Sequence, residues 1–193
     1  MTFYNPTLSK ENLIERLVNL DKELYMYALR NKVKTSKIDM LIAGSSALIL
    51  NGITISKTAD IDVLKLSHYI EEELLERYDM NSRVMGVESS IPYNYEDRIV
   101  KLDLETKIIQ YYLLSIEDAV CSKIQANRGK DWEQINNSNI LEQIDWNKLK
   151  ICAEEMHDSL ITDEQFRWFL ARYNDFVEVN GHEDCIISDL QLV

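Results

Sequence analysis

The chain is short of the residues that mark disordered, disulfide-stapled and membrane-spanning proteins. Only five glycines and two prolines occur in 193 residues, which excludes a linker-like or low-complexity chain. The three cysteines are odd in number and have no CxxC spacing, so we expect reduced thiols. No apolar run approaches the ~20 residues of a membrane span, and the first residues lack the regions of a signal peptide. The sequence therefore predicts a soluble, cytoplasmic protein.

Basic residues are also scarce, and this limits the partners that the surface can attract. The chain has 33 acidic and 21 basic residues, a formal net charge of −12. A general nucleic-acid binder needs a basic surface for phosphate contacts, so a tRNA substrate is disfavoured, although a local basic patch can act within an acidic protein. The three histidines are scattered, and no zinc set, Walker A or dinucleotide fingerprint occurs.

The residues that are present suit a folded enzyme of mixed architecture. At 46% hydrophobic, the chain can bury a substantial core, and its length fits one domain or one domain with a helical appendage. Apolar periodicity alternates between strand and helix, which predicts an α/β (α+β) fold. We place a first domain with an N-terminal helix at 1–135 and a C-terminal helical region at 136–193.

The stretch from Met40 to Lys65 organises the first domain. An apolar strand over 38–43 leads into the small residues Gly44-Ser45-Ser46, and a short helix over 45–51 precedes a strand over 60–65. Free backbone N–H groups at such a turn favour an anion such as phosphate. The sequence therefore predicts an anion site directly after the first strand.

Two carboxylates follow on the next strand. Alternation puts Asp60 and Asp62 on one face and Ile61 and Val63 on the other. The two carboxylates are then about 7 Å apart along the strand, a spacing that can cradle a hard divalent cation. Anion and metal sites in one unit indicate phosphoryl or nucleotidyl transfer. The plainer interpretation is a strand with a polar outer face beside an ordinary turn.

These residues resemble the signature of the nucleotidyltransferase superfamily, in Ala43-Gly44-Ser45 and Asp60-Ile61-Asp62. The flanking words Ser46-Ala47-Leu48 and Lys57-Thr58-Ala59 resemble the small bacterial AbiEii/MenT-like branch. The resemblance implies a mixed sheet flanked by helices, with Mg²⁺ as the cofactor. It also implies roles for particular residues: metal binding by Asp60 and Asp62, and nucleotide binding by Gly44, Ser45, Ser46, Lys57 and Thr58.

A later segment resembles the second half of the same signature. It has a Leu-Ser-x-Glu-Asp start at 114–118, Lys123 on the following helix, and Arg-x-Lys-Asp at 128–131. The resemblance implies that Lys123 contacts the triphosphate and that Asp131 lies in the active site, where it orients Lys123 or acts as a base. The family usually has a second acid where Gln134 stands. A structural alternative is that Lys123 is an exposed helix residue and Asp131 an N-cap.

Asp103 is a candidate third carboxylate. We expect strands near 98–104 and over 108–114, with Asp103 and Lys101 on one face. Asp103 would act as a general base or a further metal ligand. An outward polar residue near a turn is the alternative.

Capping residues mark the remaining helices. We expect Ser9 to begin a helix that runs to about Asn31, and Ser67 to cap a helix through Arg77. The region 138–178 is helical, and Thr162 with Gln165 can form a capping box. An aromatic stripe follows, either as core or as the lining of a base pocket: Phe166, Phe169, Tyr173 and Phe176. The tail over 181–193 docks on the body or on a second subunit, which would give a homodimer.

Together these features predict Mg²⁺-dependent transfer of a nucleoside monophosphate from an NTP, such as ATP or GTP, to a hydroxyl. The AbiEii/MenT resemblance implies the toxin of a toxin–antitoxin or phage-defence pair, acting on tRNA or protein and controlled by an antitoxin. Two other hypotheses remain. One is a catalytically inactive nucleotide-binding module, and the other is an aminoglycoside-type adenylyltransferase.

Overall fold

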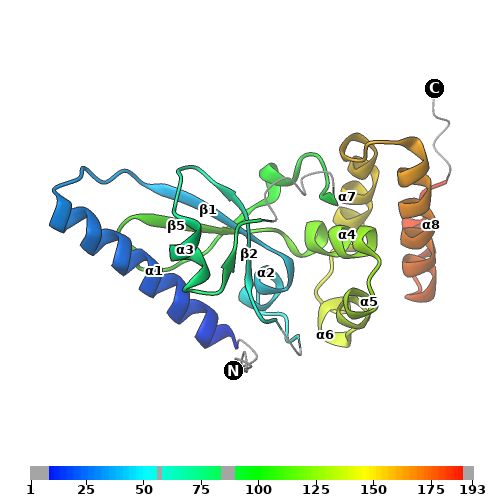
Figure 1. Cartoon of the computed structure of the whole chain (residues 1–193). Helices are drawn as coiled ribbons and strands as arrows, with labels where there is room; N and C mark the ends of the chain where they lie inside the picture. The colour runs from blue at the N-terminus through cyan, green and yellow to red at the C-terminus, as the bar shows by residue number, and fades with distance from the viewer. Residues whose placement is uncertain (1–8, 56–57, 84–89, 189–193) are drawn as a thin grey trace, which may run out of the picture. The chain divides into compact units, whose positions relative to one another are not determined.

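Residues 9–55, 58–83 and 90–188 are described in the computed structural model, and they divide into two units (Figure 1). The first unit comprises Met1–Gly86 and Ile99–Leu114, and the second comprises Val87–Arg98 and Ser115–Val193. Lys57 lies outside the described residues.

A mixed five-stranded sheet forms the described centre of the first unit. Its strands are β1 (Ile38–Ala43), β2 (Ile61–Leu66), β3 (Met80–Asn81), β4 (Val100–Lys101) and β5 (Ile109–Leu113), in the order β3-β2-β1-β5-β4. Strand β1 is antiparallel to β2 and parallel to β5, and the edge strands pair as β2 with β3 and β4 with β5. The predicted α/β fold with a mixed sheet is therefore confirmed.

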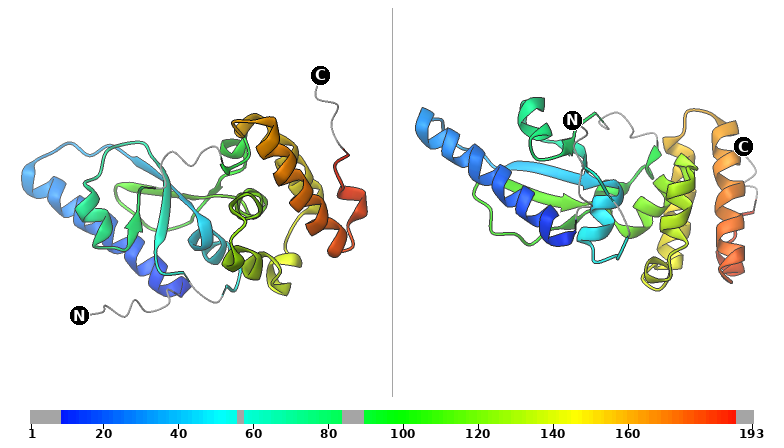
Figure 2. Two further views of the ribbon diagram at one scale, coloured as in Figure 1. Left: turned by 45° about the vertical axis from the view of Figure 1, so that its right-hand side comes forward. Right: turned by 60° about the horizontal axis from the view of Figure 1, so that its bottom comes forward.

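Helix α1 (Lys10–Asn31) runs along this sheet (Figure 2). Ser9 is its N-cap, as predicted, and the Ser9 hydroxyl accepts the Asn12 N–H at 3.3 Å. The side chains that share its buried face have no exposed surface: Leu13, Leu17 and Leu20. Burial of this aliphatic stripe supplies the apolar free energy that holds the helix in place.

Asp21 of α1 adds a polar anchor between the helix and the sheet. Its side chain is buried, and its Oδ1 accepts the N–H groups of Ile108 and Ile109 at 2.8 and 2.7 Å. Its Oδ2 accepts the Lys107 N–H at 2.8 Å. One carboxylate thus satisfies three backbone donors at the start of β5, which fixes the register of α1 against the sheet.

Two predicted elements are shorter than expected. Ser67 does not cap a helix, because its hydroxyl accepts the Asp39 N–H at 2.8 Å and its own N–H donates to the Asp39 carbonyl. Ser67 thereby extends the pairing of β1 and β2, and α3 begins only at Glu72 (Glu72–Glu76). The strand expected near 98–104 is limited to β4, with Lys101 its last residue.

The second unit is helical in its described part. Its elements are η2 (Tyr95–Arg98), α4 (Ile116–Ala126), α5 (Gly129–Ile135), α6 (Ser138–Leu141), α7 (Trp146–Ser159), α8 (Asp163–Val179) and η3 (Glu183–Cys185). Figure 2 shows α7 and α8 side by side. No helix in the described ranges is both long and apolar enough to cross a membrane.

The caps and core of this unit agree with the sequence. Ser115 caps α4, and Thr162 and Gln165 form the capping box of α8. The aromatic stripe of α8 belongs to the core, since its four rings are at most 3% exposed: Phe166, Phe169, Tyr173 and Phe176. The described part of the tail docks on α8, where Ile187 exchanges hydrogen bonds with the Asn174 side chain.

The Asp21 anchor leads to a stability prediction. Asp21→Asn would present an amide donor to N–H groups that need an acceptor, so we expect the free energy of unfolding to fall by about 3 kcal/mol. Urea denaturation of the purified chain measures this loss. The control is Asp39→Asn, at an exposed side chain in the same unit, with an expected change under about 0.5 kcal/mol. Equal stability of the two variants would contradict the anchor.

Candidate active site

The turn between β1 and α2 brings a glycine against a carboxylate. Gly44 begins α2 (Gly44–Leu50) with φ of +63°, in the left-handed region that glycine adopts without steric cost. The preceding residue, Ala43, pairs with Asp62 across β1 and β2. A Cβ added to Gly44 would overlap the Oδ2 atom of Asp62. The Asp62 carboxylate therefore lies directly against the backbone of the turn, and only glycine leaves it this space.

The second carboxylate, Asp60, lies just before β2. Its side chain is exposed, Asp62 is half-buried, and Ile61 and Val63 have no exposed surface, so the predicted alternation holds along this segment. Thr58 is buried, and its hydroxyl donates to the Asp60 carbonyl at 2.9 Å. Thr58 thus fixes the backbone that presents Asp60.

The serines of the turn differ in what their side chains do. Ser46 is fully buried, and its hydroxyl donates to the Ala43 carbonyl at 2.9 Å, which closes the turn from inside. Ser45 is half-buried in the first turn of α2. Of the two hydroxyls, the one on Ser45 is therefore the better placed to meet a ligand.

The donor set suits a cation that arrives with a phosphate ligand. Among the residues that the structure describes, no three His, Cys, Asp or Glu side chains gather as a metal site. Asp60 and Asp62 would supply two carboxylates, and Mg²⁺ commonly takes only one or two from protein and the rest from substrate phosphates and water. The pair therefore fits Mg²⁺ bound together with a nucleotide.

A cavity of about 240 Å³ adjoins Asp60 in the first unit. Arg83, which lines the cavity, donates to Glu76 at 3.0 Å, and Asp79 pairs with Arg16. The lining is acidic on balance and includes these polar residues: Asp60, Glu72, Glu76, Asp79, Asn81 and Arg83. This charge disfavours a triphosphate in the cavity itself and favours a cationic group.

Asp103 lies apart from the Asp60–Asp62 pair. It is exposed and follows β4, at the edge of the sheet opposite β3. Strands β1 and β5 separate β4 from β2, which corresponds to about 14 Å at ordinary strand spacing. The structure therefore does not bring Asp103 beside the other two carboxylates.

The residues predicted from the later segment form a buried cluster in the second unit. Lys123, on α4, is only 5% exposed, and its ammonium donates to Asp131 Oδ1 at 3.1 Å and to Gln134 Oε1 at 2.5 Å. Asp131 is 1% exposed and lies in the first turn of α5, whose N-cap is Arg128. The structural alternative, with an exposed Lys123 and Asp131 as an N-cap, is thus wrong.

Arg128 completes this cluster, although the sequence did not single it out as a site residue. Its Nε donates to Asp131 Oδ2 at 2.5 Å and its Nη2 to Asp131 Oδ1 at 3.3 Å, while its side chain is 59% exposed. The Arg-x-Lys-Asp spacing was the available signal, because it places the guanidinium one helical turn from the carboxylate.

Asp131 stays ionised in this setting. Burial alone would raise its pKa, but the hydrogen bonds and charges of Arg128 and Lys123 outweigh burial and lower the pKa of Asp131. A carboxylate with a lowered pKa is a weak proton acceptor. Together with the hydrogen bond from Lys123 to Asp131, this lowered pKa favours the role of orienting Lys123 over that of a base.

The first unit thus combines a mixed sheet with a glycine turn and two carboxylates, and the second unit holds a buried lysine–aspartate pair. The chain belongs to the family described as nucleotidyltransferase of unknown function (DUF6036), whose model matches residues 15–180. The protein is therefore a nucleotidyltransferase enzyme. No curated protein and no solved structure matches the chain.

The Gly44 contact gives a direct test of the turn. Gly44→Ala must adopt a left-handed backbone, which costs about 1–2 kcal/mol, and also displace the Asp62 carboxylate, which adds about 2 kcal/mol, so we expect a total loss of stability of about 3–4 kcal/mol. Gly52→Ala is the matched control, because Gly52 also has a positive φ (+97°) but no atom within 4 Å of an added Cβ. Adding Asp62→Ala to Gly44→Ala should recover part of the loss. Equal losses at the two glycines would contradict the close approach.

The Asp131 cluster gives a pH-dependent prediction. Asp131→Asn leaves Lys123 buried without its carboxylate, and we expect a loss of about 3 kcal/mol at pH 7. Because the folded pKa of Asp131 is lowered, the wild-type advantage is complete above about pH 5 and shrinks as pH falls below about 4, through the folded pKa. Urea unfolding across pH 3–7 measures it. An advantage that grows toward acid pH would contradict the assignment.

Proposed function

We propose that this protein transfers a nucleoside monophosphate from an NTP to a hydroxyl group in a Mg²⁺-dependent reaction that releases pyrophosphate. The observation that carries the proposal is the packing of Asp62 against Gly44, where a carboxylate for a cation meets a turn suited to phosphate. Membership in the nucleotidyltransferase family supports it.

The chain's own residues would divide the work as follows. Asp60 and Asp62 hold the cation, and the Gly44–Ser45 turn offers backbone N–H groups and a hydroxyl to the triphosphate. Bound Mg²⁺ would neutralise charge on the transferred phosphate and align the attacking hydroxyl. In the second unit, Lys123 is the residue that we propose to contact the phosphates of the nucleotide, with Asp131 setting its orientation, and Lys57 adds a further cation.

The biological role that we propose is that of an AbiEii/MenT-like toxin in a toxin–antitoxin or phage-defence pair. The similarity of the flanking words Ser46-Ala47-Leu48 and Lys57-Thr58-Ala59 to that branch supports this role. The acceptor would be tRNA or protein, and the net charge of −12 favours protein. An antitoxin would then be the natural partner.

The acidic cavity beside Asp60 favours one second candidate, an aminoglycoside-type adenylyltransferase. Carboxylates such as Glu72 and Glu76 would attract a polycationic acceptor whose hydroxyl receives the nucleotide. Labelled NTP incubated in parallel with tRNA, a basic protein and an aminoglycoside separates the candidates by the acceptor that carries the label.

The proposed site is tested by calorimetric titration of each NTP in the presence of Mg²⁺. We expect the double variant Asp60→Asn/Asp62→Asn to bind the preferred NTP at least tenfold more weakly than wild type, because the cation loses both protein ligands. Asp103→Asn is the matched control, since it removes a carboxylate of the same unit at the far edge of the sheet, and its binding should be unchanged. Wild-type affinity in the folded double variant would contradict the proposal.

A further inference from the structure

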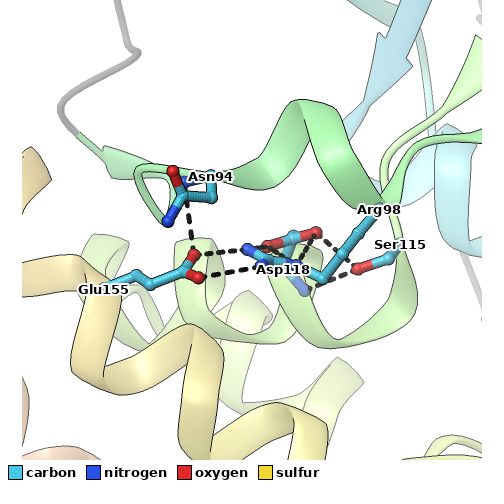
Figure 3. A network of polar contacts seen from close by, with 5 residues as sticks. All are labelled: Asn94, Arg98, Ser115, Asp118 and Glu155. Carbon is cyan, nitrogen blue, oxygen red and sulfur yellow. Dashed lines mark hydrogen bonds and ion pairs between the residues drawn. The ribbon is translucent and has the colours of Figure 1, made fainter.

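A second buried ion cluster lies at the start of α4 (Figure 3). The Arg98 guanidinium donates to Asp118 through Nη2 at 2.7 Å and Nε at 3.2 Å, and to Glu155 through Nη1 at 3.0 Å and Nη2 at 2.7 Å. The Ser115 hydroxyl donates to Asp118 at 2.6 Å, and the Asn94 N–H donates to Glu155 at 3.2 Å. One guanidinium therefore joins three elements: η2, α4 and α7.

The cluster is largely buried, and Arg98 and Glu155 remain charged. Asp118 has no exposed surface, and the Arg98 and Glu155 side chains are 19% and 16% exposed. Burial would lower the pKa of Arg98, but its bonds to the two carboxylates outweigh burial and raise that pKa. For Glu155 the directions are reversed. Burial would raise the pKa of Glu155, but its hydrogen bonds to Arg98 outweigh burial and lower that pKa.

Such a cluster fixes the relative position of the helices that it joins more than it adds net stability. Apolar residues of comparable volume often replace a buried ion network at no cost in stability, whereas removal of one partner leaves an uncompensated charge. Apolar burial is non-directional. The fork of Arg98 is directional, because both carboxylates must meet it in one geometry.

The same helix carries Lys123. Asp118 precedes Lys123 by five residues, about 7.5 Å along the helix axis at 1.5 Å per residue. At that later point the Lys123 ammonium is bound to Asp131 and Gln134 of α5. Helix α4 is thus held near each end by a buried ionic contact, to α7 at one end and to α5 at the other.

We propose that Arg98 is a positioning residue for Lys123. By bridging Asp118 to Glu155, it sets the axial position and rotation of α4, and thereby the position of the Lys123 ammonium within the second unit. The inference rests on the proposed function of Lys123. Arg98 itself need not touch the substrate, and its effect passes through α4.

The test compares Arg98→Met, Arg98→Lys and Glu155→Gln with wild type, well below their melting temperatures. Arg98→Met should lower kcat/KM for the NTP at least tenfold, since small misplacements of a binding group have effects of this size or larger. Arg98→Lys restores the positive charge but not the planar guanidinium, so it should recover only part of the lost kcat/KM. Glu155→Gln keeps a hydrogen-bond acceptor for Arg98, so this variant should fold and should lose less kcat/KM than Arg98→Met.

Two controls separate positioning from general instability. Tyr173→Phe removes a buried hydrogen bond to the Cys185 carbonyl elsewhere in the same unit, and it should leave kcat/KM unchanged. Hydrogen exchange reports on the clamp without any activity, and amides of α4 should exchange at least tenfold faster in Arg98→Met than in Tyr173→Phe.

Lys123→Ala separates an error in the proposed role of Lys123 from an error in the positioning role of Arg98. If wild type and Lys123→Ala bind every NTP alike, the proposed role of Lys123 is wrong, and hydrogen exchange still decides whether Arg98 holds α4. If Lys123→Ala binds weakly but Arg98→Met and Glu155→Gln keep wild-type kcat/KM, the positioning role of Arg98 is overturned.

Discussion

The close approach of the Asp62 carboxylate to the Gly44 backbone is the constraint on which the first unit depends. A Cβ at position 44 would displace the Asp62 carboxylate from the turn. Three features of the surrounding structure hold this contact in place. Gly44 directly follows the buried strand β1, and pairing of Ala43 with Asp62 fixes the register of β1 against β2. The Asp21 anchor holds α1 on the sheet.

In the second unit, buried ionic contacts fix the position of helix α4. Helix α4 presents Lys123 to Asp131 and Gln134, and its first turn is clamped through Asp118. Buried ion pairs add little net stability, but they tolerate few alternative geometries. The unit therefore combines an aromatic and aliphatic core, which supplies the stability, with two ionic contacts that determine where α4 lies.

Much of this could be predicted from sequence, because the signals were local. Ser9, Ser115 and Thr162 all cap helices as expected, and the strand–turn–helix–strand order around Gly44 was correct. The errors arose from distant pairing. Ser67 has the sequence context of a cap, yet Asp39, far away in the chain, engages its hydroxyl. Similarly, the Arg98 cluster joins residues 20 and 57 positions apart, and no local pattern reports such a contact.

We propose that Asp60 and Asp62 hold a divalent cation together with the nucleotide. The most direct measurement is electron paramagnetic resonance of Mn²⁺, as a stand-in for Mg²⁺, titrated with the protein in the presence and absence of a non-hydrolysable NTP analogue. We expect the nucleotide to strengthen Mn²⁺ binding in wild type and Asp62→Asn to abolish this increase. If the nucleotide strengthened Mn²⁺ binding equally in wild type and in Asp62→Asn, this role of Asp62 would be contradicted.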